Sequence, residues 1–228
     1  MAKRSGSESL AVDVADKLRD DIFNRRLAPG ERLKPTELSA RFGVSTGVVR
    51  EALSLLAAQD LIRIERNRGF HVMQLSAQAF SDLTATRTIV EGAALAVSVE
   101  HGGVKWESEL LAAHHRMISE PVYFSGEENV YNLDWGVAHR AFHYKLIEAC
   151  GNPVLLEVCS RLSASAEVYR AWAVPHQGDA VRDVAAEHRA LLDAALAHDS
   201  PLAVELLKQH FERTVADLVR AEAGVPSH

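Results

Sequence analysis

The sequence predicts a mainly α-helical protein with two parts: an N-terminal winged helix-turn-helix of three helices and a small β-hairpin, then an antiparallel all-α helical bundle. Three observations lead to this prediction. Residues 42–53 have the turn, cap and apolar spacing of a helix-turn-helix. Two short apolar runs within residues 61–73 are typical of a hairpin. The remaining chain shows helical segments with clear breaks and no strand-like alternation.

Length and composition limit the class of protein. A chain of 228 residues can form two small domains, and a hydrophobic content of 47% is ordinary for a globular protein. No apolar run approaches the roughly 20 residues that span a bilayer, and residues 1–9 lack the apolar segment of a signal peptide. Cys150 and Cys159 are too few for a disulfide framework. We therefore expect a cytoplasmic protein with no membrane partner.

The net charge of −6 is unevenly distributed. Residues 1–75 hold 13 basic and 10 acidic residues, a balance of +3, whereas residues 76–228 hold 12 and 21, a balance of −9. A basic module on an acidic remainder is typical of a nucleic-acid-binding domain joined to a domain with another task. Many domains that bind no nucleic acid have a balance of +3, so the motifs must decide the assignment.

Two helices are expected before the helix-turn-helix turn. Residues 1–9 are expected to be a flexible tail, and residues 10–26 an amphipathic helix whose apolar stripe begins at Leu10. Thr36 is a candidate N-cap for a short helix that ends at Arg41.

The turn and the helix after it carry the clearest local signals. Gly43 supplies a tight turn, where a side chain would resist positive φ, and Ser45 is a good N-cap. Five apolar residues then recur at helical spacing and form one stripe: Val48, Val49, Ala52, Leu53 and Leu56. An ordinary helical hairpin would show the same features, so this segment alone leaves both interpretations open.

A β-hairpin is expected next. The apolar runs 61–64 and 70–73 flank a polar turn that carries Arg66 and Arg68. Basic residues at such a tip are placed to meet phosphates or the narrow minor groove of DNA. We therefore expect residues 10–75 to form a winged helix-turn-helix.

The remaining chain predicts a bundle. A linker over residues 76–79 and a bundle over residues 80–222 are expected. Short connections between the helices imply antiparallel neighbours. The expected helices are 77–101, 105–119, 127–150, 153–173, 178–198 and 200–222.

Histidines are the residues of this bundle with metal-binding chemistry. His139 and His143 are spaced i,i+4, so both project from one helix face, as a chelating pair requires. His188 follows Glu187 on a later helix, and His210 lies on the last one. Because isolated histidines are usually ordinary surface or core residues, this pattern alone leaves a metal site and simple packing open.

The N-terminal part resembles the DNA-binding domain of GntR-family bacterial transcriptional regulators at residues 27–33, 37–45, 49–53 and 67–69. The family often has Arg where this chain has Thr46, and Thr-Pro or Thr-Thr in place of Gly47-Val48. The resemblance implies a double-stranded DNA operator, which a homodimer would read as a palindrome because one recognition helix reads few base pairs. The expected DNA-binding residues are Thr36, Ser45, Thr46, Gly47, Arg50, Arg66, Arg68 and Gly69.

The C-terminal part resembles the FCD ligand-binding domain of the FadR subgroup of GntR regulators at residues 142–143, 149–153, 187–192, Asp199 and His210. In that domain an Asp and three His commonly hold a divalent metal, often zinc, below an effector cavity. His143, His188 and His210 match the three His positions, and His139 stands at the Asp position. The resemblance implies a metal site of these four histidines, for which zinc, nickel, iron or copper are suitable ions.

Polar residues on inward-facing helices are the candidate effector-binding residues. Arg87, one turn before Glu91, matches an arginine that often binds a carboxylate in the family. An i,i+4 surface ion pair is the alternative for these two residues. Trp135, Tyr169 and Arg170 are further candidates, with ordinary packing as the alternative.

These observations lead to a bacterial regulator, not an enzyme, whose helical domain binds a small organic acid at a metal centre. Residues 104–108 and 112–116 also resemble carbon-starvation regulators of this subgroup, which indicates a short dicarboxylate. Two alternatives are open: a metal-dependent hydrolase with an N-terminal docking module, and a structural metal in a protein-interaction scaffold. Turnover assays would identify the hydrolase, and a cavity above the metal would argue against the scaffold.

Overall fold

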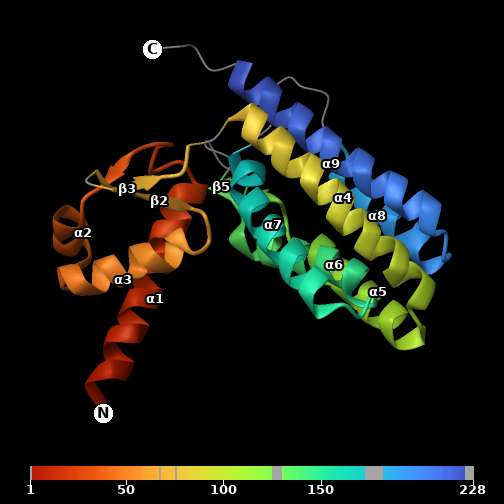
Figure 1. Ribbon diagram of the computed structural model, residues 1–228, viewed down its shortest axis with the longest axis horizontal. Coiled ribbons are helices and arrows are strands. Elements are labelled where there is room, and N and C mark those ends of the chain that lie inside the picture. Colours follow the sequence, from red (N-terminus) through yellow and green to blue (C-terminus); the bar gives the residue numbers. More distant parts are fainter. Residues whose placement is uncertain (1, 67, 75, 125–129, 173–181, 224–228) are drawn as a thin grey trace. The chain divides into compact units, whose positions relative to one another are not determined.

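The chain forms two compact units, Met1–Leu75 and Ser76–His228 (Figure 1). The computed structural model describes residues 2–66, 68–74, 76–124, 130–172 and 182–223. Within these segments, every helix is too short or too polar to cross a bilayer.

The described part of the first unit has the three predicted helices and the predicted hairpin of β2 and β3, to which the unpredicted strand β1 adds in the antiparallel order β1-β3-β2. Leu33 pairs with Phe70 across β1 and β3, and Phe70 pairs with Ile64 across β3 and β2. The elements of the first unit are α1 (Ala2–Phe23), β1 (Arg32–Leu33), α2 (Pro35–Phe42), α3 (Thr46–Ala57), β2 (Ile62–Glu65) and β3 (Gly69–Val72).

The turn between α2 and α3 has the predicted geometry. Gly43 has a φ of 66°, in the left-handed region that favours glycine. The Ser45 hydroxyl accepts a hydrogen bond from the backbone N–H of Val48 at 3.3 Å. The whole apolar stripe of α3 is buried: Val48, Val49, Ala52, Leu53 and Leu56. The opposite face of α3, which includes Thr46 and Arg50, is exposed.

Two expectations for the first unit were wrong in detail. Helix α1 begins at Ala2 instead of Leu10, and Leu10 is 46% exposed. Thr36 does not cap α2, because Lys34 holds the N-cap position and Pro35 opens the helix. Proline suits that first position, since it lacks an N–H that would have no partner there.

The second unit is a helical bundle in which α4 packs against α6, α7 and α9. Figure 1 shows α4 beside α9 over much of their length. The elements of the second unit are α4 (Ala77–His101), α5 (Val104–Ile118), β4 (Tyr123–Phe124), β5 (Val130–Tyr131), α6 (Leu133–Glu148), α7 (Pro153–Trp172), α8 (Val184–Leu196) and α9 (Ser200–Ala223).

A short antiparallel strand pair was not expected in this unit. Tyr123 of β4 pairs with Tyr131 of β5, and strands of two residues are too short to show alternation in sequence. Helix α6 begins only after Asn132, whose side chain accepts from the Asp134 N–H at 2.9 Å. Helix α8 likewise begins after Asp183, later than expected. Residues 125–129 and 173–181 lie outside the described part of the chain.

His198 joins three segments of the second unit. Its Nδ1 lies 2.7 Å from the Val99 carbonyl oxygen, and its Nε2 lies 3.0 Å from Glu107 Oε1. Two oxygen acceptors favour the imidazolium, which donates from both nitrogens, so the hydrogen bond to Glu107 raises the pKa of His198 above its ordinary 6.5.

The His198 contact predicts a pH-dependent contribution to stability. Because the folded-state pKa is raised, the contribution is complete below the unfolded pKa and is lost as pH rises through the folded value. Glu107→Gln should therefore lower the melting temperature more at pH 6 than at pH 9. NMR titration should show a lower His198 pKa in the variant. An equal change in melting temperature at both pH values would contradict this account.

Candidate metal centre and DNA-facing surface

Four histidines from three helices meet in the interior of the second unit. His139 and His143 lie one turn apart on α6, while α8 contributes His188 and α9 contributes His210. Each side chain is buried, with at most 4% exposure. One candidate ligand atom from each residue lies within 4.8 Å of all the others. The structure thus brings together the four residues that the sequence selected.

The ring nitrogens of this cluster are short of hydrogen-bond partners. His143 Nε2 lies 3.3 Å from His188 Nε2, so two imidazoles face each other. The Nδ1 atoms of His139 and His143 are buried and have no hydrogen-bond partner among the described residues. Buried polar atoms are normally paired, and imidazole is a preferred ligand of zinc, copper, nickel and iron. The donor set therefore fits a divalent transition metal.

Burial keeps these imidazoles uncharged. It lowers the pKa of His139, His143 and His188 well below 6.5, and the other imidazoles of the cluster lower it further. Burial also lowers the pKa of His210 to about 4, although the hydrogen bond to Glu187 acts in the opposite direction. A neutral imidazole has a free lone pair, which a metal ligand requires.

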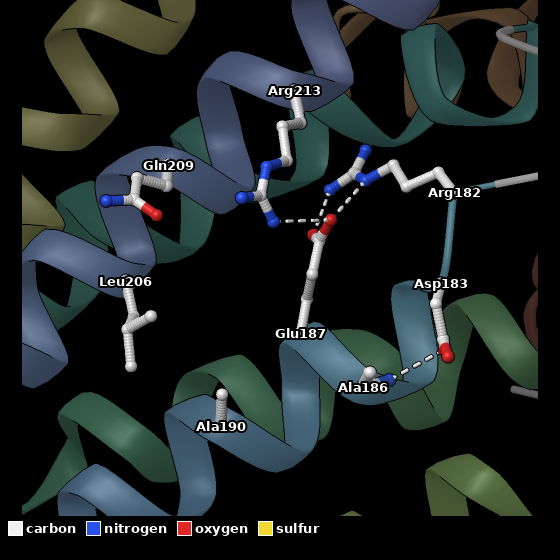
Figure 2. Close-up of a pocket in the computed structure, with 8 residues that line it drawn as sticks. All are labelled: Arg182, Asp183, Ala186, Glu187, Ala190, Leu206, Gln209 and Arg213. Carbon is white, nitrogen blue, oxygen red and sulfur yellow. Dashed lines mark hydrogen bonds and ion pairs between the residues drawn. The ribbon is translucent and has the colours of Figure 1, made fainter. Parts of the chain in front are cut away.

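Among the described residues, His210 is the histidine of this cluster that contacts a carboxylate. Its Nδ1 lies 2.8 Å from Glu187 Oε2. Figure 2 shows the Glu187 carboxylate between the guanidinium groups of Arg182 and Arg213, which reach Glu187 Oε1 at 2.8 and 3.1 Å. Hydrogen bonds from Arg182 hold the pKa of Glu187 far below its usual value, against the effect of burial.

A cavity of about 350 Å³ reaches this cluster at His143. Its lining includes the acidic Glu91 and three basic residues, Arg116, Arg140 and Lys145. Arg140 pairs with Glu167 at 2.8 Å and Lys145 with Glu109 at 2.9 Å, so part of this positive charge is already balanced, and exposed Arg116 adds to what remains for an anionic ligand.

Arg87 and Glu91 form a buried ion pair instead of a surface pair. Arg87 Nε donates to Glu91 Oε1 at 2.6 Å, and both side chains are at most 4% exposed. The Arg87 guanidinium also lies 4.0 Å from the centre of the Phe211 ring. Glu91 lines the cavity, whereas the cavity lining does not include Arg87.

The other three candidates for effector binding are mostly packed against protein groups. The Trp135 ring stacks on His139 at 4.6 Å, so it forms part of the wall of the histidine cluster. Tyr169 stacks on Phe80 at 4.5 Å. Arg170 donates to Glu167 Oε2 at 2.6 Å and lies near enough to lower the pKa of His139.

The sequence analysis missed several charged residues around the site. Arg116 and Arg140 line the cavity, and Arg140 also pairs with buried Glu167 at 2.8 Å. Arg182 holds Glu187 from just before α8. The adjacency of Arg140 to His139 and the five-residue spacing of Arg182 and Glu187 were the available signals, because the cavity contacts depend on how separate helices pack.

The residues expected to bind DNA lie at the surface of the first unit. Thr36 on α2, Thr46, Gly47 and Arg50 on α3, and the cap Ser45 are exposed. Arg66 and Arg68 are exposed near the hairpin tip, where Gly69 has a φ of 94°. Arg68 lies 3.6 Å from Glu65 in an exposed ion pair. Such a pair contributes little to stability, so a phosphate could replace Glu65 as the partner of Arg68.

Known proteins resemble both units. Residues 10–72 match the gntR family of bacterial regulatory proteins, and residues 82–213 match the FCD domain. The chain is 38% identical to the uncharacterized HTH-type transcriptional regulator BphR of Paraburkholderia xenovorans, over 91% of the chain and 84% of BphR. It is 30% identical to the HTH-type transcriptional repressor GlaR of Escherichia coli, over 91% and 94% of the two chains.

A solved structure shares the fold. McbR/YncC of E. coli superimposes with a TM-score of 0.68 and 21% identity, over 92% of this chain and 97% of the other. The matched families and relatives are transcriptional regulators, which removes the hydrolase alternative. The chain therefore belongs to the GntR family of bacterial DNA-binding transcriptional regulators, with an FCD domain as its second part, and it is not an enzyme.

Proposed function

We propose that the FCD domain of this regulator holds one divalent metal ion and binds a small organic acid beside it, and that the acid alters operator binding. The observation that carries the proposal is the cluster of four buried histidines with candidate ligand atoms within 4.8 Å. His139, His143, His188 and His210 would hold the ion, with zinc as the first candidate. The bound ion would supply positive charge to an anionic ligand.

The residue at position 139 strengthens the preference for an acid. In the related domains an Asp ligand would reduce the charge of a divalent centre to +1, whereas four neutral imidazoles leave it at +2. Arg116 of the adjacent cavity adds a positive charge, whereas Arg140 and Lys145 in the same lining are paired with carboxylates. A short carboxylate or dicarboxylate therefore suits this cavity better than a neutral sugar or an amine.

For the first unit, we propose that a homodimer reads a palindromic operator. One short recognition helix reads few base pairs, so two related copies are needed for a specific site. The exposed face of α3 would enter the major groove, and the hairpin tip would meet the neighbouring backbone or minor groove. The relative GlaR is named as a repressor, and we propose repression as the mode of action here.

Arg50 and Arg68 give a direct test of the DNA-facing surface. Arg50→Ala should weaken operator binding by roughly 1–3 kcal/mol if the guanidinium reads a base. If Arg68 contacts a phosphate, Arg68→Ala should reduce the slope of log operator affinity against log salt concentration by about one. Mobility-shift titrations at several salt concentrations measure both effects. Exposed Arg189, on α8, is a matched control outside this unit. Unchanged binding in both variants would reject the assignment.

Metal analysis tests the histidine cluster. Protein purified without a nickel column should contain about one divalent transition metal per chain. Removal by a chelator should lower the melting temperature, and zinc at about 100 times its dissociation constant should restore roughly 2.7 kcal/mol. His188→Ala should abolish that response, whereas exposed His101→Ala should retain it. Metal-free protein that is insensitive to added zinc would end this proposal.

Calorimetry on metal-loaded protein tests the ligand class. His139→Asp should weaken binding of short acids about thirtyfold, since a unit charge about 8 Å away contributes roughly 2 kcal/mol at an effective dielectric constant of 20. Arg116→Gln should weaken it less, because Arg116 is exposed. Arg87→Ala is a poor test, because it would leave Glu91 buried without its partner. Acid affinity that is indifferent to both variants, or a preference for neutral ligands, would contradict the proposal.

A further inference from the structure

The Nδ1 atom of His210 has two neighbours with opposite hydrogen-bonding character. Glu187 Oε2 lies 2.8 Å away, and a terminal nitrogen of the Arg182 guanidinium lies 3.1 Å away. An ionised carboxylate only accepts hydrogen bonds, and a guanidinium only donates them. Glu187 therefore requires the proton of His210 on Nδ1, whereas Arg182 would require it on Nε2.

Only one of these two tautomers leaves Nε2 with a free lone pair. The contact to Glu187 is the shorter one, and the guanidinium of Arg182 has other acceptors. It donates to Glu187 Oε1 at 2.8 Å, to Thr214 Oγ1 at 2.9 Å and to Asp217 Oδ2 at 3.0 Å. The same terminal nitrogen that approaches Nδ1 also donates to the His210 carbonyl oxygen at 2.9 Å. The geometry therefore favours the Nδ1–H tautomer of His210.

We infer that Glu187 is a positioning residue, which fixes the tautomer and the ring orientation of His210 so that Nε2 is available to a metal. This inference rests on the metal site proposed above. Figure 2 shows how the carboxylate is held: the side chain rises from α8 between Arg182 and Arg213, and both guanidinium groups bind it. Partners of this kind orient imidazole ligands and increase their basicity.

The other members of the cluster show why this contact matters. The Nδ1 atoms of His139 and His143 have no hydrogen-bond partner among the described residues, so no carboxylate fixes their tautomers. His210 is the member of the cluster for which such a partner is present. His210 lies on α9, whereas His139 and His143 lie on α6. Glu187 thus prepares one ligand before any metal arrives.

Glu187→Gln is the decisive variant. A glutamine offers one acceptor oxygen to the guanidinium groups of Arg182 and Arg213, so its amide N–H₂ turns to His210 and favours the wrong tautomer. Two-bond ¹H–¹⁵N correlation spectra of histidine-labelled, metal-free protein read the tautomer directly. We expect Nδ1–H in the wild type and a shift towards Nε2–H in the variant. Zinc affinity, measured by chelator competition, should fall about 10–100-fold.

Two further variants complete the design. Glu212→Gln removes the same charge from an exposed position on α9 and should leave the tautomer and the zinc affinity unchanged. Glu187→Asp keeps the charge on a shorter side chain and should fall between the wild type and Glu187→Gln, which gives a second measurement if the glutamine variant folds poorly.

The outcomes separate the two proposals. A lower melting temperature with unchanged tautomer and zinc affinity would reduce Glu187 to a structural ion-pair partner and overturn the inference. A wild type that binds no transition metal would instead overturn the proposed metal centre. Wild-type zinc binding with an Nε2–H tautomer at His210 would reject the role of Glu187 alone.

Discussion

Four uncharged imidazoles share the interior of the helical unit, and the surrounding structure depends on how they are accommodated. A buried polar group without a partner is costly, and two ring nitrogens of this cluster, the Nδ1 atoms of His139 and His143, have no partner among the described residues. Aromatic rings enclose it: Trp135 stacks on His139, and Phe211 packs against His143 at 6.0 Å. Such an arrangement contributes little to a core by itself, and the metal ion proposed above would give it a physical reason.

Buried ion pairs lie close to this cluster and limit what can bind there. Arg87 is paired with Glu91, and Arg170 is paired with Glu167. Buried pairs of this kind contribute little net stability, because the cost of removing the charges from water offsets their attraction. Their proximity still affects the histidines, since Arg170 lowers the pKa of both His139 and His143. The nearby guanidinium group of Arg170 therefore favours the neutral form of these imidazoles.

The parts of this structure that follow local rules could be predicted from sequence. Ser45 caps α3, and the apolar stripe from Val48 to Leu56 is buried, because both depend only on neighbouring residues. His139 and His143 share a face through their spacing, whereas the addition of His188 and His210 needed the family resemblance. Tertiary contacts were out of reach: nothing local to Arg213 on α9 indicates that it will bind Glu187 on α8 at 3.1 Å.

Helix α4 links the position of the cavity to the boundary between the two units. It begins at Ala77, where Ser76 caps it with a 3.0 Å hydrogen bond to the Ala79 N–H, directly after the DNA-binding unit ends. The same helix carries Glu91, which lines the cavity, about 21 Å further along its axis. A ligand can change operator affinity only if it prefers one placement of the DNA-binding units. The ligand proposed above, if it contacted Glu91, would act on the continuous helix whose first residue, Ala77, follows the DNA-binding unit, and this is how its preference for one placement would reach that unit.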